Sequence, residues 1–142
     1  MTLTPEIDAK VRASFARQTM MATLGAELID LGHGTARIAA PILPGSRQQQ
    51  DAGHAALTFA IGDSAAGYAA LTLFDADAEI MTVEMKINLL RPAVGARLIA
   101  EGRVLKPGRR VTVVQADVFA ETDDTRKQIA VLQGTMIPVT SG

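Results

Sequence analysis

Apolar and polar residues alternate along the second half of the chain. In residues 79–93, EIMTVEMKINLLRPA, the apolar positions are Met81, Val83, Met85, Ile87 and Leu89, with polar residues between most of them. A period of two is typical of a strand with one buried face. Residues 98–104, 111–121 and 129–139 alternate in the same way between polar turns, and residues 27–42 form a shorter hairpin around Gly32-His33-Gly34. The pattern predicts about six strands in hairpin succession.

Two segments have the features of helices. Thr4-Pro5-Glu6 combines an N-cap, a first-turn proline and an acid, and predicts a helix over about residues 5–20. Residues 54–73 are rich in Ala, Gly, Ser and Thr and are apolar on nearly all faces. Such a helix is buried when the rest of the domain surrounds it. We do not expect it to span a membrane, because Asp63 near its middle would need a partner there.

Together these elements predict a single α+β domain over residues 1–142. Two short strands, one buried helix and four long strands give an antiparallel sheet with its helix on one side. Sheets twist, and the concave face of a curled sheet accommodates a long apolar helix. This arrangement, with an additional N-terminal helix, is the hotdog fold. We expect Thr82, Glu84 and Lys86 on the strand face that points away from the central helix.

Composition narrows the classes of function. Hydrophobic residues make up 48% of the 142 residues and charged residues 20%, which is enough apolar material for a core. The net charge of −1 provides no basic field for nucleic acid or anionic lipid. There is no cysteine, and His33 and His54 are the two histidines, so we expect no metal centre. The N-terminal residues lack a continuous apolar stretch, and we expect a cytoplasmic protein.

Asp63 is the candidate for chemistry because it is a charge in an otherwise uncharged helix. A buried carboxylate needs hydrogen-bond donors or has a raised pKa. Two interpretations stay open. Asp63 is either structural, satisfied by hydroxyls such as that of Thr58 or by backbone amides, or functional, since carboxylates with shifted pKa values concentrate at active sites.

The start of the same helix is the second candidate. His54 precedes Ala55 and Ala56 where the helix begins. The free amide groups of a helix N-terminus can hold a developing oxyanion. The small side chains of Ala55 and Ala56 let a substrate carbonyl approach closely. The His54 ring itself is better explained as a helix-start group that bonds the preceding turn, which is the commoner role of a lone histidine.

These residues carry a family resemblance. The pattern Gln48-x5-His54-Ala55-Ala56-x6-Asp63 resembles the Asn/Gln…His-Gly-Gly…Asp signature of hotdog acyl-CoA thioesterases, in particular the phenylacetic-acid-degradation (PaaI-type) group. MTVEMKINLLRPA resembles that family's strand ending in Arg/Ser-Pro-Ala, VLKPGRRVTVVQADVF its strand–turn–strand with a basic turn, and VLQGTMIPV its last strand. The resemblance covers about residues 20–140.

The resemblance implies a role for each matching residue. Asp63 would act as general base on water or as nucleophile, a choice that the family leaves open. The Ala55 N–H would polarise the thioester carbonyl, with His54 supporting that turn. Gln48 would lie against the carbonyl or the attacking water, and Thr82 would position that water. The chain departs from the family in having Ala-Ala for Gly-Gly, which would strain the backbone if Ala55 needed a positive φ.

Coenzyme A enters as part of the substrate, and no separate cofactor is implied. Its phosphates are natural partners for exposed Arg and Lys. Arg91 near a strand end and Lys106, Arg109 and Arg110 in the basic turn are candidates for this contact, although each is equally explained as a solvated hairpin residue.

The spacing also predicts assembly. Nine residues of helix span about 13 Å, so one thioester cannot touch both the helix start and Asp63 of the same chain. A second copy with an antiparallel helix would bring Asp63 of one chain beside His54 and Ala55 of the other, giving two equivalent sites. We expect a homodimer, and members of the resembling family often form homotetramers.

Two other classes of function remain open. A non-catalytic hotdog protein that binds acyl-CoA or lipid would use Asp63 structurally. A hotdog hydratase or dehydratase would pair a catalytic histidine with a carboxylate. Asp51 precedes His54 by three residues, whereas the hydratase spacing is Asp-x4-His.

Overall fold

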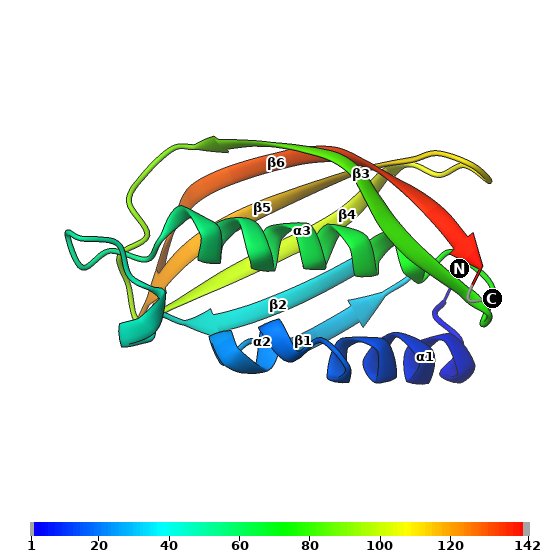
Figure 1. Cartoon of the computed structure of the whole chain (residues 1–142), viewed down its shortest axis with the longest axis horizontal. Helices are drawn as coiled ribbons and strands as arrows, with labels where there is room; N and C mark the ends of the chain where they lie inside the picture. Colours follow the sequence, from blue (N-terminus) through cyan, green and yellow to red (C-terminus); the bar gives the residue numbers. More distant parts are fainter. Residues whose placement is uncertain (1, 141–142) are drawn as a thin grey trace.

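A computed structural model describes residues 2–140 as a curved sheet with one long helix along its inner face (Figure 1). The elements are α1 (Pro5–Ala16), α2 (Thr19–Leu24), β1 (Glu27–Gly32), β2 (Thr35–Pro41), the 3-10 turn η1 (Pro44–Ser46), α3 (Ala55–Leu71), β3 (Ala78–Leu89), β4 (Arg97–Lys106), β5 (Thr112–Thr122) and β6 (Thr125–Thr140). The sheet order is β1-β2-β4-β5-β6-β3, and every neighbouring pair is antiparallel. The predicted α+β hotdog fold is confirmed.

The central helix α3 forms the core together with the inner face of the sheet. Leu57, Ile61 and Leu71 of α3 are fully buried, and Ala65 and Ala66 have no exposed surface. The prediction of an all-round apolar helix at 54–73 is confirmed, with the helix two residues shorter at its C-terminal end. Among residues 2–140, no helix has the length and apolar character that a membrane crossing requires.

The N-terminal helix ends earlier than predicted. Thr4 caps α1 by accepting a hydrogen bond from the Ile7 amide at 3.3 Å, as its N-cap pattern predicts. The helix ends at Ala16, because Gln18 has an extended backbone (φ −79°, ψ 97°) and starts a second helix. The Gln18 side chain turns toward α3 instead and donates to the Tyr68 hydroxyl at 2.8 Å. The single helix predicted over 5–20 is therefore wrong in its last turn.

A β-bulge in β3 changes which side chains face α3. Thr82 pairs with Met136 and Glu84 with Thr135, so Val83 is an extra residue without a partner on β6. The extra residue reverses the alternation at that point. Residues Ile80 and Thr82 before the bulge, and Met85 and Ile87 after it, lie on the α3 side.

This bulge corrects the predicted strand faces in part. Met81 and Val83, predicted to be buried, are 55% and 57% exposed. Thr82, predicted to point away from the helix, donates to Asp63 on α3. Glu84 lies on the outer face as predicted, where it accepts a hydrogen bond from Thr135 at 2.7 Å.

The helix α3 approaches the sheet most closely at β4. A Cβ atom at Gly102 would lie 2.3 Å from the carbonyl carbon and oxygen of Ala65. A side chain at position 102 is thus excluded, and the backbone of β4 is in direct contact with the backbone of α3. This contact fixes the height of α3 above the sheet.

We expect Gly102→Ala to lower the free energy of unfolding by about 3 kcal/mol, because the added methyl overlaps backbone atoms that cannot rotate away. Urea denaturation followed by circular dichroism measures the change. Gly45→Ala is the matched control, since no atom lies within 4 Å of the Cβ position there. Equal stability of the two variants would contradict this account of the packing.

Candidate active site

Asp63 lies on the face of α3 that the sheet leaves uncovered. Its side chain is partly buried, and its Oδ1 accepts a hydrogen bond from the Thr82 hydroxyl at 2.8 Å. Burial raises the pKa of Asp63 above its ordinary value of 3.8, and the Thr82 hydrogen bond opposes this rise. The bulge at Val83 is what turns Thr82 toward this carboxylate. The second oxygen, Oδ2, has no hydrogen-bond partner within residues 2–140 and remains available to a ligand.

Two cavities meet at Asp63. The Tyr68 cavity, of about 320 Å³, extends toward the C-terminal end of α3 and is lined by Ser14, Arg17, Gln18, Asp63, Ser64, Gly67, Tyr68, Glu79, Ile80 and Thr82. The Met20 cavity, of about 600 Å³, extends toward the start of α3 and is lined by Gln18, Met20, Met21, Ala55, Ala56, Phe59, Ala60, Asp63, Ser64 and Ile87. The Asp63 carboxylate therefore lies between the Tyr68 cavity, which is lined mainly by polar residues, and the Met20 cavity, which is lined mainly by apolar residues.

The start of α3 presents one free amide. His54 is the N-cap, with an extended backbone (φ −65°, ψ 145°), and its Nδ1 accepts from the Ala56 amide at 2.9 Å. The Ala55 N–H, by contrast, has no partner in the part of the chain that the structure describes. Ala55 and Ala56 are both exposed. Ala55 is thus the position at which α3 offers a hydrogen bond to a carbonyl oxygen.

The Ala-Ala departure from the family signature introduces no backbone strain. Within residues 2–140, the non-glycine residues with positive φ are Asp51 and Asp123. Ala55 is the first residue of α3 and has helical geometry. Ala55 therefore needs no positive φ, and the condition under which Ala-Ala would strain the backbone is not met.

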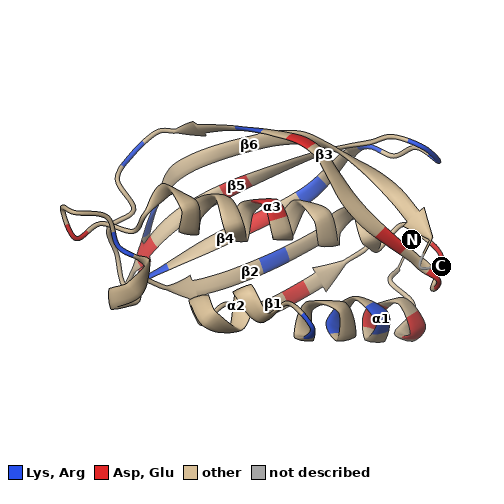
Figure 2. Ribbon diagram, viewed as in Figure 1, with Lys and Arg blue, Asp and Glu red and all other residues tan. Residues whose placement is uncertain are grey.

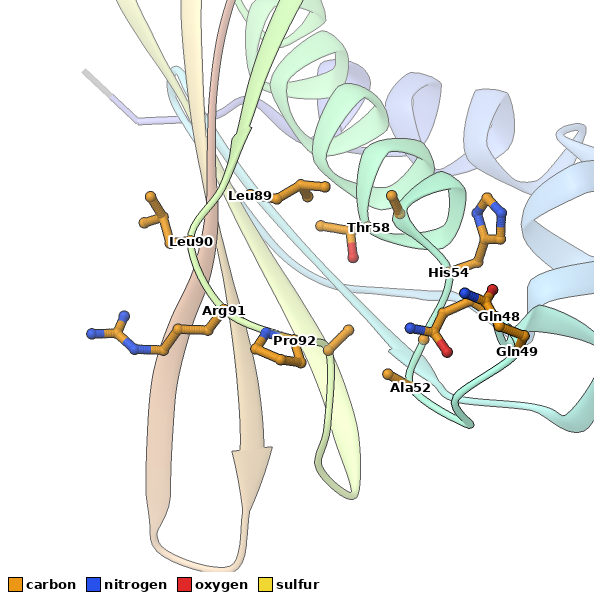
Figure 3. A pocket seen from close by; sticks show the side chains of 12 residues that line it. Gln48, Gln49, Ala52, His54, Thr58, Leu89, Leu90, Arg91 and Pro92 are labelled. Atoms are coloured by element: carbon orange, nitrogen blue, oxygen red, sulfur yellow. The ribbon is translucent and has the colours of Figure 1, made fainter.

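Gln48 lies in the loop before α3, beside His54. Its side-chain oxygen accepts from the Gln50 backbone N–H, and its backbone N–H donates to the Ala52 carbonyl at 2.9 Å. Figure 3 shows Gln48 and Gln49 next to His54, with Thr58 and Leu89 facing each other further along the same cavity of about 480 Å³. The side-chain NH₂ of Gln48 is the group left to contact a ligand there.

The predicted coenzyme A contacts lie in two separate places. Arg91 lines the cavity at the start of α3, but Figure 3 shows its side chain directed away from α3. It donates to the Gln128 carbonyl at 2.7 Å. Lys106, Arg109 and Arg110 lie at the β4–β5 turn, at the opposite end of the sheet (Figure 2). Within one chain the four residues do not form one site.

Sequence reasoning missed Gln18, Ser64 and Gly67 as lining residues. Gln18 reaches the site because the chain breaks between α1 and α2, which the pattern does not indicate. Gly67 follows Asp63 by four residues and therefore shares its side of the helix, whereas Ser64 lines the cavity from the adjoining face. The four-residue spacing is a signal that could have identified Gly67.

The curled sheet around α3 places this chain among hotdog-fold proteins, and a carboxylate and a free amide on one helix define its candidate site. A family model described as the Thioesterase superfamily matches residues 53–127, and the chain belongs to this family. The resemblance to hotdog thioesterases is thereby confirmed, and with it thioester hydrolysis as the general class of activity.

Individual relatives agree with this assignment. The chain is 39% identical to a thioesterase family protein from Silicibacter pomeroyi, with a TM-score of 0.92 over 95% of this chain and 99% of the other. It is 32% identical over 100 residues, 70% of each chain, to a "Putative esterase" of Saccharolobus solfataricus. The E. coli PaaI protein from the phenylacetic acid degradation operon, 18% identical, has the same fold with a TM-score of 0.85 over 96% of both chains.

We expect Asp63→Asn to stabilise the protein at neutral pH. Because burial raises the pKa of Asp63, the folded state favours the protonated carboxyl, and stability falls as the pH rises through the folded-state pKa. Asparagine resembles the protonated carboxyl and carries no charge, so the variant does not lose stability as the pH rises. Urea denaturation at several pH values should show a gain at pH 7 that disappears below pH 3.8, the ordinary pKa of aspartate.

The exposed turn residue Asp124 provides the control, and we expect Asp124→Asn to leave stability unchanged at each pH. A loss of stability in Asp63→Asn at pH 7 would instead mean that the ionised carboxylate is held by favourable contacts.

Proposed function

We propose that this protein hydrolyses acyl-CoA thioesters at a site shared by two copies of the chain. The observation that carries the proposal is the pairing of a free Ala55 N–H and a partly buried Asp63 on one helix. Eight residues separate them, a rise of about 12 Å. Both line the Met20 cavity, but one thioester cannot contact both groups of the same chain. Two antiparallel copies of α3 would pair each Asp63 with the other chain's Ala55.

The exposed edge of the sheet supports this assembly. β3 pairs with β6 alone among the described strands, so the outer edge of a 12-residue strand is unpaired. Met81 and Val83 on this strand are largely exposed. Long exposed edges with apolar residues favour pairing with another chain. The uncovered face of α3 lies next to this edge, because Thr82 of β3 contacts Asp63 of α3.

The chemistry follows from the two groups. The Ala55 N–H donates to the thioester carbonyl oxygen and stabilises the oxyanion that forms on attack. Asp63 either takes a proton from water as the water oxygen attacks the carbonyl carbon, or attacks that carbon itself, with water releasing the acid afterwards. In both routes the tetrahedral intermediate collapses, the carbon–sulfur bond breaks and the CoA thiolate leaves. In the general-base route the proton held by Asp63 passes to the thiolate; in the nucleophilic route an acyl–Asp63 anhydride remains, which water then hydrolyses. Thr82 holds Oδ1, which directs Oδ2 toward the reacting group.

The antiparallel arrangement also supports one site for coenzyme A. Arg91 lies at the start of α3, and the β4–β5 turn with Lys106, Arg109 and Arg110 lies at the other end. Reversing the second copy brings its β4–β5 turn toward the first copy's Arg91. The guanidinium and ammonium groups would then hold the phosphates of coenzyme A. A homotetramer would pair two such dimers.

We expect Asp63→Asn to lower kcat for acyl-CoA hydrolysis at least about 100-fold, since the amide is neither a base nor a nucleophile. Thiol release from a panel of acyl-CoA esters measures the rate, and calorimetry measures acyl-CoA binding, which should persist. Asp124→Asn, on the exposed β5–β6 turn and away from every cavity residue named above, serves as the control. An unaltered protein that binds acyl-CoA without turnover would instead be a non-catalytic acyl-CoA carrier.

A second variant removes the proposed oxyanion donor alone. Proline lacks an N–H but fits the first position of a helix. The preceding residue must be extended, and His54 already is, with ψ 145°. Ala55→Pro therefore deletes one unpartnered N–H and leaves the helix intact, and Ala55→Gly is its control because it retains the amide.

Mixing the two inactive variants tests the shared site. In a 1:1 mixture of Asp63→Asn and Ala55→Pro, half of the dimers are mixed, and each mixed dimer has one site with both groups native. We therefore expect recovery of about a quarter of the unaltered activity after the subunits are exchanged. Thiol release before and after exchange in mild denaturant measures it. No recovery, with exchange confirmed by mass spectrometry, would place both groups in one chain's site.

A further inference from the structure

The Tyr68 cavity extends from Asp63 along α3 and is lined by residues of a single chain. Tyr68, which forms its far wall, is 4% exposed and packs edge-on against the Phe15 ring at a centroid distance of 5.9 Å. Residues of α1, the α1–α2 break, α3 and the start of β3 line it, and Arg17 and Glu79 at its rim are exposed to solvent. An acyl group whose carbonyl carbon lies at Asp63 can therefore extend into this space without a partner chain.

Gly67 leaves room for a ligand in the cavity. It lies one turn beyond Asp63 on the same side of α3. A Cβ atom at this position would meet the Met136 methyl at 3.6 Å and the Ile80 Cγ2 at 3.8 Å, which are ordinary contacts. Position 67 thus tolerates a methyl group. Because glycine lacks that group, the passage between Asp63 and Tyr68 is wider than it would be with alanine.

The wall of the Tyr68 cavity contains one hydroxyl hydrogen that has no acceptor among residues 2–140. The Tyr68 oxygen accepts from the Gln18 amide at 2.8 Å and shares a hydrogen bond of 3.2 Å with the Ser14 hydroxyl. The Ser64 hydroxyl donates to the Gln18 oxygen at 3.4 Å. Ser14 and Tyr68 together carry two hydroxyl hydrogens, and their mutual bond uses one. The other has no partner among residues 2–140.

The charged groups of the cavity favour a neutral ligand. Arg17, Asp63 and Glu79 are its ionisable lining residues apart from Tyr68, and the Arg17 guanidinium already pairs with Glu79 at 3.2 Å. Among residues 2–140, no unpaired cation lines this cavity. A carboxylate at the end of the acyl group would meet like charge, whereas a hydroxyl could both donate and accept.

The Met20 cavity is mainly apolar, in contrast to the polar Tyr68 cavity. Its walls away from Asp63 are formed by Met20, Met21, Phe59 and Ile87. It lies along the face of α3 that the proposed dimer covers. These apolar walls would favour an apolar acyl group, and an acyl group bound there would contact the second chain.

We infer that the Tyr68 cavity is the acyl subsite and that Ser14, Gln18 and Tyr68 select a compact acyl group that carries a neutral hydroxyl. This inference rests on the proposed thioesterase function and names the substrate class within it. Tyr68 binds the hydroxyl, Gln18 and Ser14 orient the Tyr68 phenol, and Gly67 provides the passage. Tyr68 also remains protonated, since burial raises its pKa above the ordinary value.

The test compares butanoyl-, hexanoyl- and octanoyl-CoA with their terminally hydroxylated forms and with adipoyl-CoA. We expect the preferred hydroxylated ester to exceed its plain counterpart about tenfold in kcat/KM, and adipoyl-CoA to be the poorest substrate of its length. In Tyr68→Phe, the ratio of hydroxylated to plain ester should fall to about one. A merely structural role for Tyr68 would lower both rates and leave the ratio unchanged.

Two cavity variants identify where the acyl group lies. Gly67→Ala should lower the ratio of octanoyl-CoA to acetyl-CoA hydrolysis, whereas Met20→Ala on the other cavity should leave that ratio unchanged. The reverse result, or equal hydrolysis of plain and hydroxylated esters by the unaltered protein, overturns the inference while leaving the proposed function in place. Failure of the unaltered protein to hydrolyse any of these esters overturns the proposed function itself.

Discussion

The contact between the backbones of α3 and β4 is the constraint on which the rest of the structure depends. Gly102 has no side chain, and Ala65 has a single methyl, so the helix lies directly on the sheet. A helix held at that height is enclosed by the inner face of the sheet on one side only. Its other face, which carries Ala55, Phe59 and Asp63, is not covered by the sheet and forms one wall of the candidate site.

The properties of Asp63 follow from this placement and from one irregularity in β3. Partial burial of the carboxylate raises its pKa, while the bulge at Val83 supplies the Thr82 hydroxyl that fixes its orientation. A regular strand would have turned Thr82 outward and placed an apolar residue against Asp63. The site thus depends as much on a local departure from strand geometry as on the helix itself.

Sequence periodicity was sufficient to identify the layers of the fold and the two ends of the candidate site. The all-round apolar pattern of 54–73 indicates a buried helix, and a lone Asp63 within it indicates an unusual carboxylate. The free N–H at Ala55 follows from the general geometry of a helix start. These features are local, so the residues themselves determine them.

The features that sequence did not reveal depend on contacts between distant segments. The break at Gln18 is accompanied by a hydrogen bond to Tyr68, 50 positions away in the chain. The bulge at Val83 is defined by its pairing with β6, more than 50 residues later. In both cases the local pattern is compatible with a regular element, and the tertiary partner decides the outcome.

The fixed height of α3 has a mechanical consequence for the entry of bulky groups. Since Gly102 and Ala65 leave no clearance, α3 cannot sink toward the sheet to enlarge a neighbouring space. The α1–α2 layer on the other side of α3 is fastened differently: Val11, Met21 and Leu24 are buried against the core, and exposed polar contacts such as Arg17 to Glu79 hold its rim. Exposed contacts of this kind are weak in water. A bulky group is therefore admitted by rearrangement of side chains on that side of α3 and not by movement of the helix toward the sheet.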